Sequence, residues 1–317
     1  MNSHLSRSRA LALIGAGTLS LAPGVARAQA QPIRLGTLPN GETYALPFYA
    51  QDGGFFAKAG LNVQIVPVGE PSSIIASVAG GSLDAGFADP PLIGNATNRG
   101  LPVAYFAGGG LYSTEAPTTV LVVAPNSTFK TPKDFHGKTI AVVVAKSIGA
   151  AALTSWIIQG GGDANQIKLI EMPFTVMVTA VVKGDIAGAF LAEPYLTNAK
   201  NDIKVIAKPF DAIGPRFFIN SCFAARSWIA ANTVTAGKLA SALVEASKWV
   251  NGHHDESAPS LAKASKVPLE VVKSMTRVRF AEIDPRLIQP VLDTAYKFKL
   301  METPVNASDI VVKLPAA

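Results

Sequence analysis

The sequence predicts an α/β protein that folds as two similar lobes. The same pattern of a helix end, a glycine, a short apolar strand and an acid followed by proline occurs twice, at residues 78–90 and 181–194. Segments that alternate at every second residue are interspersed with segments of helical periodicity, which is typical of α/β folds. Hydrophobic residues are 49% of the 317 residues and charged residues 16%, so the chain can bury a core and is not disordered.

Each copy of the repeated pattern ends in a polar corner. Asp89 and Pro90 follow the first strand, and Glu193 and Pro194 follow the second with one extra residue between strand and acid. Open α/β sheets bind ligands at the carboxyl ends of their strands. Two such corners in one chain therefore predict two lobes that face one ligand.

Residues 1–30 indicate a secretory signal peptide. Arg7 and Arg9 precede an apolar run to about residue 25, and small residues at 26, 28 and 30 provide cleavage sites. The run is short for a membrane span and contains glycine and proline. Ser8 separates the two arginines, so a twin-arginine signal fits poorly and we expect the general secretory route.

The charge of the mature chain is mildly positive. The formal net charge of +6 falls by three when Arg7, Arg9 and Arg27 leave with the leader, because residues 1–30 contain no acid. This charge is too small and too scattered to indicate nucleic-acid binding. Cys222 is the only cysteine, so no internal disulfide is possible.

Strands and helices alternate in the first part of the mature chain. Strands are predicted at residues 32–38, 61–68, 84–88 and 103–107. The periodicity predicts a helix over residues 43–58 that ends at Gly60. A second helix should start at residues 71–73, where serine is a favoured N-cap, and end at Gly80. The glycines after residue 107 should end the fourth strand.

The second part repeats the alternation. Strands are predicted at residues 119–123, 140–144, 167–171 and 187–191. The β-branched segment 140–144 indicates a buried parallel strand. Helices are predicted at residues 147–159 and 175–183, and mostly amphipathic helix is predicted from Ile229 onward. Strands that alternate with helices imply parallel sheets. We expect the chain to cross between lobes near residues 113–118 and 217–225.

Several segments resemble bacterial solute-binding proteins of ABC importers. The most specific is FFAKAGLNVQIV at residues 55–66, and ASVAGGSLDAGFAD, FKTPKDFHGKTIAVVVAKSIGAAA and GAFLAEPYL follow in the family's order. The matching group is the nitrate/sulfonate/taurine-binding proteins and their relatives for the pyrimidine precursor of thiamine. The resemblance implies a two-lobed type 2 periplasmic binding fold with a hinge cleft. Lobe 1 would comprise residues 31–117 and 223–317, and lobe 2 residues 118–222.

The resemblance also implies a function and partners. The mature protein would be a periplasmic, monomeric, non-enzymatic binding component without cofactor or metal. It would capture a small polar solute in the cleft by hinge closure and deliver it to an ABC permease in the inner membrane. Two alternatives stay open: a sensory partner that presents the ligand to a membrane receptor, and an enzyme of the same fold that makes the thiamine pyrimidine. The enzyme's cysteine-rich motif is absent.

The family's ligand contacts map onto the loops after strands and onto helix starts. In the first lobe the resemblance implies Leu38, Asn40, Thr43, Tyr44, Ser72, Ser73, Asp89, Pro90, Gly110 and Tyr112. In the second lobe it implies Ser147, Ile148, Gly149, Phe174, Thr175 and Glu193.

These residue types point to two kinds of ligand. Helix starts such as Ser147 favour an anionic group. Asp89 and Glu193 favour an amine, an amidine or a heteroaromatic N–H instead, because a buried carboxylate needs a partner. Only Arg216 could supply a guanidinium, so a small dianion is less expected. The ligand would be sulfonate- or taurine-like, or amine-bearing or heteroaromatic such as a pyrimidine precursor. Of the two acids, Glu193 is the stronger candidate for ligand contact.

No catalytic motif is present. The chain contains no G-x-S-x-G, no P-loop and no G-x-G-x-x-G after a strand. Residues 253–256 are the only cluster of metal-ligand types, and adjacent histidines on a helix point in different directions.

Overall fold

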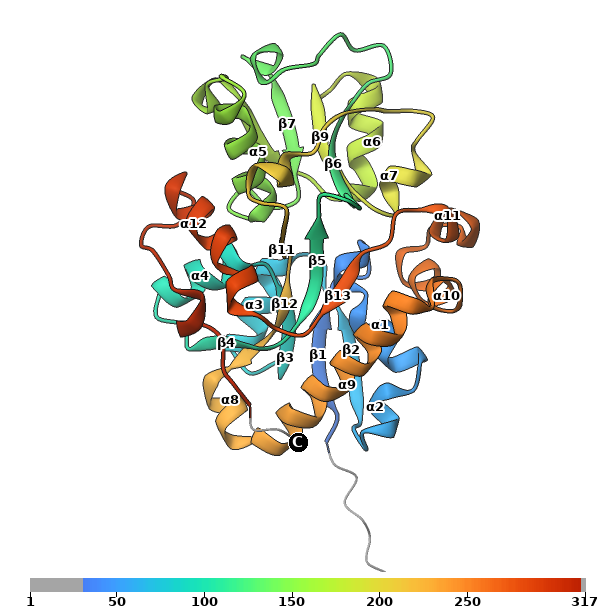
Figure 1. The fold of residues 1–317 in the computed structure, drawn as a ribbon, viewed down its shortest axis with the longest axis vertical. Coiled ribbons are helices and arrows are strands. Elements are labelled where there is room, and N and C mark those ends of the chain that lie inside the picture. The colour runs from blue at the N-terminus through green and yellow to red at the C-terminus, as the bar shows by residue number, and fades with distance from the viewer. Residues whose placement is uncertain (1–30, 315–317) are drawn as a thin grey trace, which may run out of the picture. The chain divides into compact units, whose positions relative to one another are not determined.

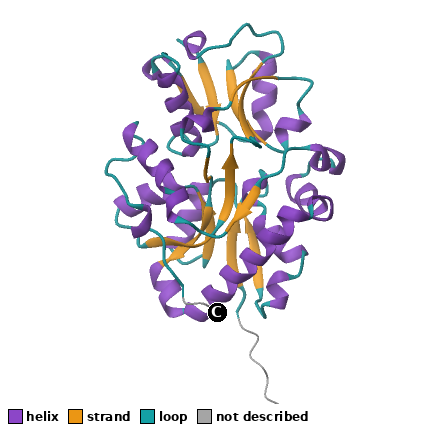
Figure 2. Ribbon diagram, in the orientation of Figure 1, coloured by secondary structure: helices purple, strands orange, loops and turns teal. Residues whose placement is uncertain are grey.

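Three β-sheets flanked by helices make up residues 31–314, which are the residues that the computed structural model describes (Figures 1 and 2). The signal peptide predicted at residues 1–30 lies outside them. Two sheets have five strands each, and the third has three. We call the parts built on the two five-stranded sheets the first lobe and the second lobe, in chain order.

The first lobe contains a mixed sheet with helices on both faces. Its strands lie in the order β2 (Val63–Pro67), β1 (Ile33–Thr37), β3 (Ala85–Ala88), β12 (Ser221–Ala225) and β4 (Val103–Ala107). The adjacent residues Cys222 and Phe223 pack into different cores, because successive side chains of a strand point to opposite faces. The core of Cys222 includes α1 (Leu46–Asp52), α2 (Phe55–Lys58) and α9 (Thr233–Gly252). The core of Phe223 includes α3 (Pro71–Ala79), α4 (Pro90–Asn98) and α12 (Gln289–Lys297).

The second lobe is built in the same way. Its strands lie in the order β10 (Lys204–Ala207), β6 (Thr119–Val123), β9 (Gly188–Ala192), β7 (Thr139–Val142) and β8 (Lys168–Glu171). Leu121 packs with α5 (Ile148–Gln159), and its neighbour Val122 packs with α6 (Phe174–Lys183) on the other face. β7 is parallel to both neighbours, as predicted for the segment 140–144.

The third sheet lies between the two large sheets in Figure 1. Its strands lie in the order β11 (Arg216–Phe218), β5 (Gly109–Ser113) and β13 (Arg279–Ala281). β5 continues the chain from β4 toward β6, and β11 continues it from the second sheet to β12. Both predicted crossing regions thus adjoin this sheet, and the exact lobe boundaries at residues 117 and 222 stay a prediction.

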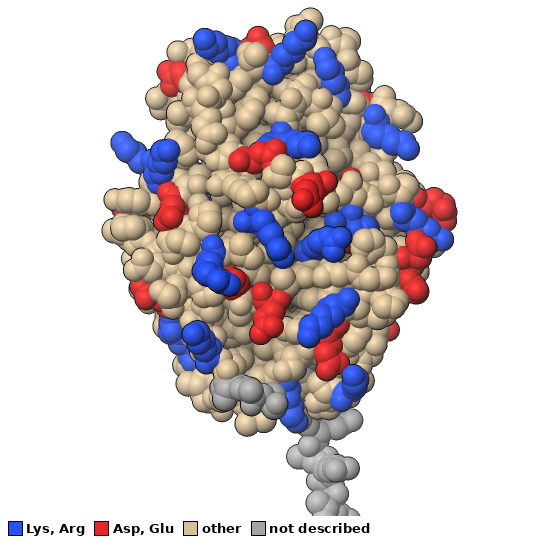
Figure 3. All heavy atoms as spheres, viewed as in Figure 1, with Lys and Arg blue, Asp and Glu red and all other residues tan. Residues whose placement is uncertain are grey.

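The remaining elements are short helices and the C-terminal helices. They are α7 (Tyr195–Asn198), α8 (Arg226–Ala231), α10 (His254–Ser265), α11 (Leu269–Ser274), and the 3₁₀ turns η1 (Glu42–Tyr44), η2 (Pro132–Phe135), η3 (Ala164–Gln166), η4 (Pro209–Ala212), η5 (Pro285–Leu287) and η6 (Ala307–Asp309). None of the helices in residues 31–314 combines the length and apolar character that a membrane span requires. Basic and acidic side chains are intermingled on the face shown in Figure 3.

The predicted parallel sheets are mixed sheets, in which β1, β2 and β3 and also β7, β8 and β9 are parallel. β12 is antiparallel to β3 and β4, and β6 is antiparallel to β9 and β10. β12 enters the first sheet directly from the second lobe, and β6 enters the second sheet directly from the first lobe. A strand that arrives from the other lobe need not follow the crossover rule that makes neighbouring strands parallel.

Two predicted helix details are wrong. The helix expected over residues 43–58 is divided into η1, α1 and α2, because Gly54 has a φ of +74° and begins α2 from a left-handed conformation. The N-cap of α3 is Glu70, not a serine, and Pro71 occupies the first turn. Ser73 instead donates its hydroxyl to Glu70 Oε1 at 3.0 Å.

Candidate functional site

A cavity of about 80 Å³, called here the inner cavity, lies between the carboxyl ends of strands from both large sheets. Leu38 follows β1 and Asp89 follows β3 on the first sheet. Val143 follows β7 and Ala192 ends β9 on the second sheet. β1 is parallel to β3 and β7 is parallel to β9, so each pair reaches the same edge of its sheet. This is the location that the two polar corners predict.

Half of the residues implied by the resemblance line the inner cavity. They are Leu38, Thr43, Tyr44, Asp89, Ser147, Ile148, Gly149 and Phe174. The lining also contains residues that the sequence did not single out as contacts: Pro71, Thr119, Val143, Val144, Phe190, Ala192, Phe210 and Ile219. Most of these are apolar, and an apolar wall looks like ordinary core in the sequence. Of these residues, only Phe190 belongs to the repeated pattern, so only this residue could have been connected with the site from the sequence.

A second cavity of about 250 Å³, called here the outer cavity, shares Leu38, Val143 and Phe174 with the inner one. Asn40 and Glu70 line it from the first lobe, and Glu171 lines it from the second. The shared walls make the two cavities neighbouring parts of one interlobe cleft. Asn40 is the one residue of the predicted site that lines only the outer cavity.

The other predicted site residues lie on neither cavity. Ser72 and Thr175 are exposed, and Pro90 is buried in the first turn of α4. Gly110 packs so closely on Thr43 that a Cβ there would lie 3.1 Å from the Thr43 Cα. Ser73, Tyr112 and Glu193 hydrogen-bond within the protein.

Tyr112 belongs to an aromatic cluster beside the cleft. Its hydroxyl donates to Asp211 Oδ1 at 2.5 Å. Its ring stacks on Phe217 with 5.1 Å between the centroids. Phe210 contacts the same ring edge-on and also lines the inner cavity. Tyr112 therefore supports a wall of the cavity without lining it.

Asp89 joins the two lobes. Its Oδ1 accepts the Leu92 N–H at 3.0 Å and so caps α4 of the first lobe. The backbone N–H of Ile148, the first residue of α5 in the second lobe, acts on the same carboxylate and lowers its pKa. Ser147 leaves this helix end without a side-chain cap, because its hydroxyl donates to the Val144 carbonyl at 2.7 Å. A carboxylate from one lobe thus lies at the helix N-terminus of the other, where the helix dipole favours negative charge.

Burial controls the protonation of Asp89. The residue is 3% exposed, and this burial raises the pKa of its carboxyl to about 7 although two backbone N–H groups lower it. Burial also raises the pKa of the Tyr44 hydroxyl, and the neighbouring Asp89 charge adds to that effect. Asp89 can therefore be protonated or ionised near neutral pH.

Glu193 lies outside both cavities, and its carboxylate hydrogen-bonds within the second lobe. Its carboxylate accepts the Thr197 N–H at 3.0 Å and the Thr197 hydroxyl at 2.8 Å, and so caps the short helix α7. Its backbone carbonyl accepts the Glu42 N–H at 3.4 Å. Burial raises the pKa of its carboxyl, and the Thr197 bonds oppose that shift. Asp89, the less favoured acid, lines the inner cavity, and Glu193 does not.

Replacing Glu193 with glutamine should therefore change ligand affinity less than threefold, in place of the more than tenfold loss that a direct contact with a cationic ligand implies. Stability should fall by about 1 kcal/mol because one acceptor of the α7 cap is lost. Titration calorimetry and urea unfolding measure the two quantities. Thr197→Ala is the matched control, since it removes the hydroxyl donor of the same cap. A tenfold loss of affinity confined to Glu193→Gln would return Glu193 to the site.

A buried ion pair supports the loop that carries Thr43 and Tyr44. Arg277 Nε lies 2.5 Å from Glu42 Oε1, and the two side chains are 4% and 0% exposed. The other Glu42 oxygen accepts the Val278 N–H at 2.7 Å. Arg277 also donates to the Ser257 hydroxyl at 3.1 Å and to the His254 carbonyl. No local pattern in the sequence indicates this pair, because its members are separated by more than two hundred residues.

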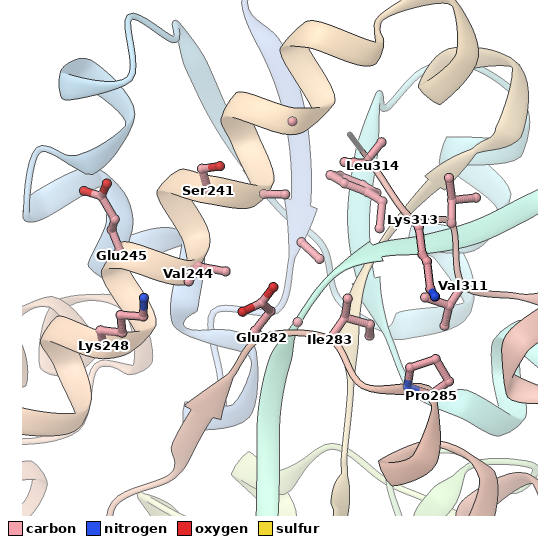
Figure 4. Close-up of a pocket in the computed structure, with 16 residues that line it drawn as sticks. Ser241, Val244, Glu245, Lys248, Glu282, Ile283, Pro285, Val311, Lys313 and Leu314 are labelled. Atoms are coloured by element: carbon pink, nitrogen blue, oxygen red, sulfur yellow. The ribbon is translucent and has the colours of Figure 1, made fainter. Parts of the chain in front are cut away.

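A larger cavity of about 580 Å³ lies away from these strand ends (Figure 4). It is lined by the end of β4 with Gly108, one side of α9, the segment after β13 and residues 311–314, and none of its walls comes from the second sheet. Its residue Glu245 is paired with Lys58 at 2.9 Å. A solute there could not contact both lobes. Within residues 31–314, no three His, Cys, Asp or Glu side chains form a group that could hold a metal ion.

Comparisons with known proteins agree with this geometry. The family model described as NMT1/THI5 like matches residues 42–257. A comparison with curated protein sequences finds no match. Among solved structures, the chain is similar to the periplasmic aliphatic sulphonate binding protein SsuA of Escherichia coli (18% identity, 90% of this chain and 93% of that one, TM-score 0.73).

Two further structures show the same fold. One is the alkanesulfonate-binding protein SsuA of Xanthomonas axonopodis pv. citri bound to MOPS (17% identity, 89% and 98% of the chains, TM-score 0.74). The other is the periplasmic nitrate-binding protein NrtA of Synechocystis PCC 6803 (14% identity, 89% and 85%, TM-score 0.74). These structures establish the α/β two-lobed fold of periplasmic binding proteins.

Proposed function

Because the chain belongs to the NMT1/THI5-like family, we propose that it is the solute-binding component of an ABC importer. One observation carries the proposal: the inner cavity is lined by strand ends of both lobes, with Asp89 of the first lobe and Ile148 of the second on its wall. A solute in that cavity contacts both lobes only when they are closed. Binding therefore shifts the protein toward the closed arrangement.

The compartment and the partner follow from the same proposal. The signal peptide predicted at residues 1–30 would deliver the mature chain to the periplasm. An inner-membrane ABC permease would receive the closed, loaded protein. The structural relatives from Escherichia coli and Synechocystis are periplasmic binding proteins, which supports this compartment. The protein would act without chemical change of its solute.

The lining of the cleft favours one of the two predicted ligand types. No Lys, Arg or His side chain lines the inner or the outer cavity. A sulfonate or nitrate in this cleft would lack a cationic partner and would lie near the Asp89 carboxylate. Tyr44, Phe174 and Phe190 supply aromatic walls for a flat or apolar group. An amine-bearing or heteroaromatic solute fits this lining better than an anion.

Filling the inner cavity tests the proposal. Native mass spectrometry of the purified mature protein should show a bound small solute of unchanged mass on release. Ala192→Leu should remove this solute because the added carbons occupy the cavity that Ala192 lines. Ala57→Leu on α2 is the matched control, since Ala57 is exposed and lines neither cavity. Chemical turnover of the solute, or equal retention by both variants, would contradict the proposal.

A further inference from the structure

We propose that the solute is a small organic cation and that Asp89 is the residue that selects its charge. This inference rests on the proposed function and names the substrate class of the same cleft. The observation behind it is the distribution of ionisable groups. The cleft contains Asp89 in the inner cavity and Glu70 and Glu171 in the outer cavity, and no basic side chain lines either one.

Asp89 has acceptor capacity left for a ligand. A carboxylate offers about four lone-pair sites. The N–H group of Leu92 uses one of them, and the Ile148 N–H lies close enough to lower the pKa of the carboxyl. An ammonium or amidinium group in the inner cavity can donate to the remaining sites, and the aromatic residues Tyr44 and Phe190, which also line this cavity, are of the type that attracts cations. An anion would meet a like charge.

Helix capping does not require this charge. Asn caps a helix about as well as Asp, so the bond to Leu92 needs an acceptor oxygen but not a carboxylate. An ionised group with 3% exposure is costly unless a counter-charge compensates it. Among the described residues Asp89 forms no ion pair, and its charge acts on the neighbouring hydroxyls of Tyr44 and Tyr105, whose pKa values it raises. The N-termini of α4 and α5 supply only partial positive charge, and a bound cation supplies a full counter-charge.

The outer cavity extends the same electrostatic pattern to the mouth of the cleft. Glu70 comes from the first lobe and Glu171 from the second. Each already accepts one internal hydrogen bond, from the Ser73 hydroxyl and the Ala145 N–H respectively, and neither forms an ion pair within residues 31–314. When the lobes are closed, these two negatively charged side chains line the same cavity and repel each other. A cation in the cleft relieves this repulsion and is attracted during approach, whereas an anion is repelled.

The charge of the solute sets the sign of the pH dependence. With the Asp89 pKa at about 7, part of the unliganded protein carries a protonated Asp89 at neutral pH. A cation binds the ionised form more tightly, so its affinity should rise as the pH increases through 7 and level off above. An anion binds the protonated form more tightly and should show the opposite slope. The slope therefore reports the class of ligand even when absolute affinities are modest.

A charge-matched panel tests the substrate class. The probes are ethylammonium, ethanol and ethanesulfonate, and benzylammonium, benzyl alcohol and phenylmethanesulfonate, each added to the mature protein in a thermal-shift assay. At least one ammonium compound should raise the Tm, and its uncharged and anionic analogues should not. Asp89→Asn keeps the acceptor for Leu92 and should weaken that ammonium compound at least tenfold, whereas Glu302→Gln, at an exposed acid outside both cavities, should not.

The outcomes distinguish the proposed binding function from the proposed cationic class of the solute. Stabilisation by a sulfonate or an alcohol but by no ammonium compound would overturn the cationic class and leave the binding function intact. Stabilisation by none of the six compounds would count against both. If Asp89→Asn does not fold, the pH dependence of ammonium affinity in the unmodified protein decides: a rise through pH 7 supports the inference, and a flat or falling profile overturns it. The double variant Glu70→Gln/Glu171→Gln should bind the ammonium compound more slowly at low salt. This result would support the proposed role of the outer cavity in attracting the cation.

Discussion

Replacing Arg277 with methionine is expected to lower the free energy of unfolding by about 3–5 kcal/mol, the cost of breaking a buried ion pair from one side. The substitution leaves the Glu42 carboxylate fully buried with no counter-charge. It also removes the donors to Ser257 and to the His254 carbonyl, so η1 and the first turn of α10 lose a shared partner. Urea unfolding of the mature protein measures the change.

Two comparisons make this prediction specific. Lys273→Met removes the exposed partner of Glu270, which lies 3.7 Å away, and should cost less than about 1 kcal/mol. The double variant Glu42→Gln/Arg277→Met should recover part of the loss, because glutamine removes the uncompensated charge. Equal stability of Arg277→Met and Lys273→Met would show that the buried pair is not a main support of the fold.

The same variant should also weaken solute binding. Glu42 directly precedes Thr43 and Tyr44, which line the inner cavity. Its backbone N–H donates to the Glu193 carbonyl of the second lobe. Releasing Glu42 loosens both the wall of the cavity and a contact between the lobes.

Replacing Gly108 with alanine is expected to cost about 3 kcal/mol or more, at the upper end of what overpacking a well-packed site usually costs. A Cβ at this position would lie 1.7 Å from the Ala281 carbonyl oxygen and 2.7 Å from the Ala281 carbonyl carbon. Both atoms are backbone, so no side-chain rotation can relieve the clash. Either β4–β5 or the end of β13 must move.

Gly214→Ala is the matched control for this substitution. No atom lies within 4 Å of a Cβ built at Gly214, and its φ is not in the left-handed region. It should change stability by less than about 1 kcal/mol. Thermal unfolding of the two variants side by side measures the difference. A Gly108→Ala protein as stable as Gly214→Ala would mean that the third sheet can shift without cost.

Elements with strong local patterns were predictable from the sequence. The strand predicted at residues 103–107 is β4, and the helix predicted at 147–159 is α5 with Ser147 as its N-cap residue. Alternation, helical periodicity and a stop at Gly160 are local properties of the sequence. They therefore specify these elements without knowledge of the tertiary contacts. β5 was not predictable, because residues 108–110 are glycines that indicate a stop. Close backbone packing, known only from the fold, requires glycine there.

The candidate site likewise has residues that local patterns predict and residues that depend on distant contacts. The residues that follow strand ends, such as Leu38, Asp89 and Ser147, line the inner cavity because strand direction places them there whatever the detailed packing. The positions of the two acids depend on neighbours outside the repeated pattern, which orient each carboxylate. Thr197 binds Glu193 outside the cavities, whereas the Leu92 N–H binds Asp89 on the wall of the inner cavity.

By itself the sequence determined the two α/β lobes, most strands and helices, and the edges of the sheets where a ligand site had to lie. Periodicity and glycine stops act over a few residues, and their consequences are readable in order along the chain. The tertiary structure alone decided the antiparallel strands β6 and β12, the choice of Asp89 over Glu193, and the pairing of Glu42 with Arg277. Each of these depends on contacts between segments far apart in the chain, and no local pattern encodes which distant group will compensate a buried charge.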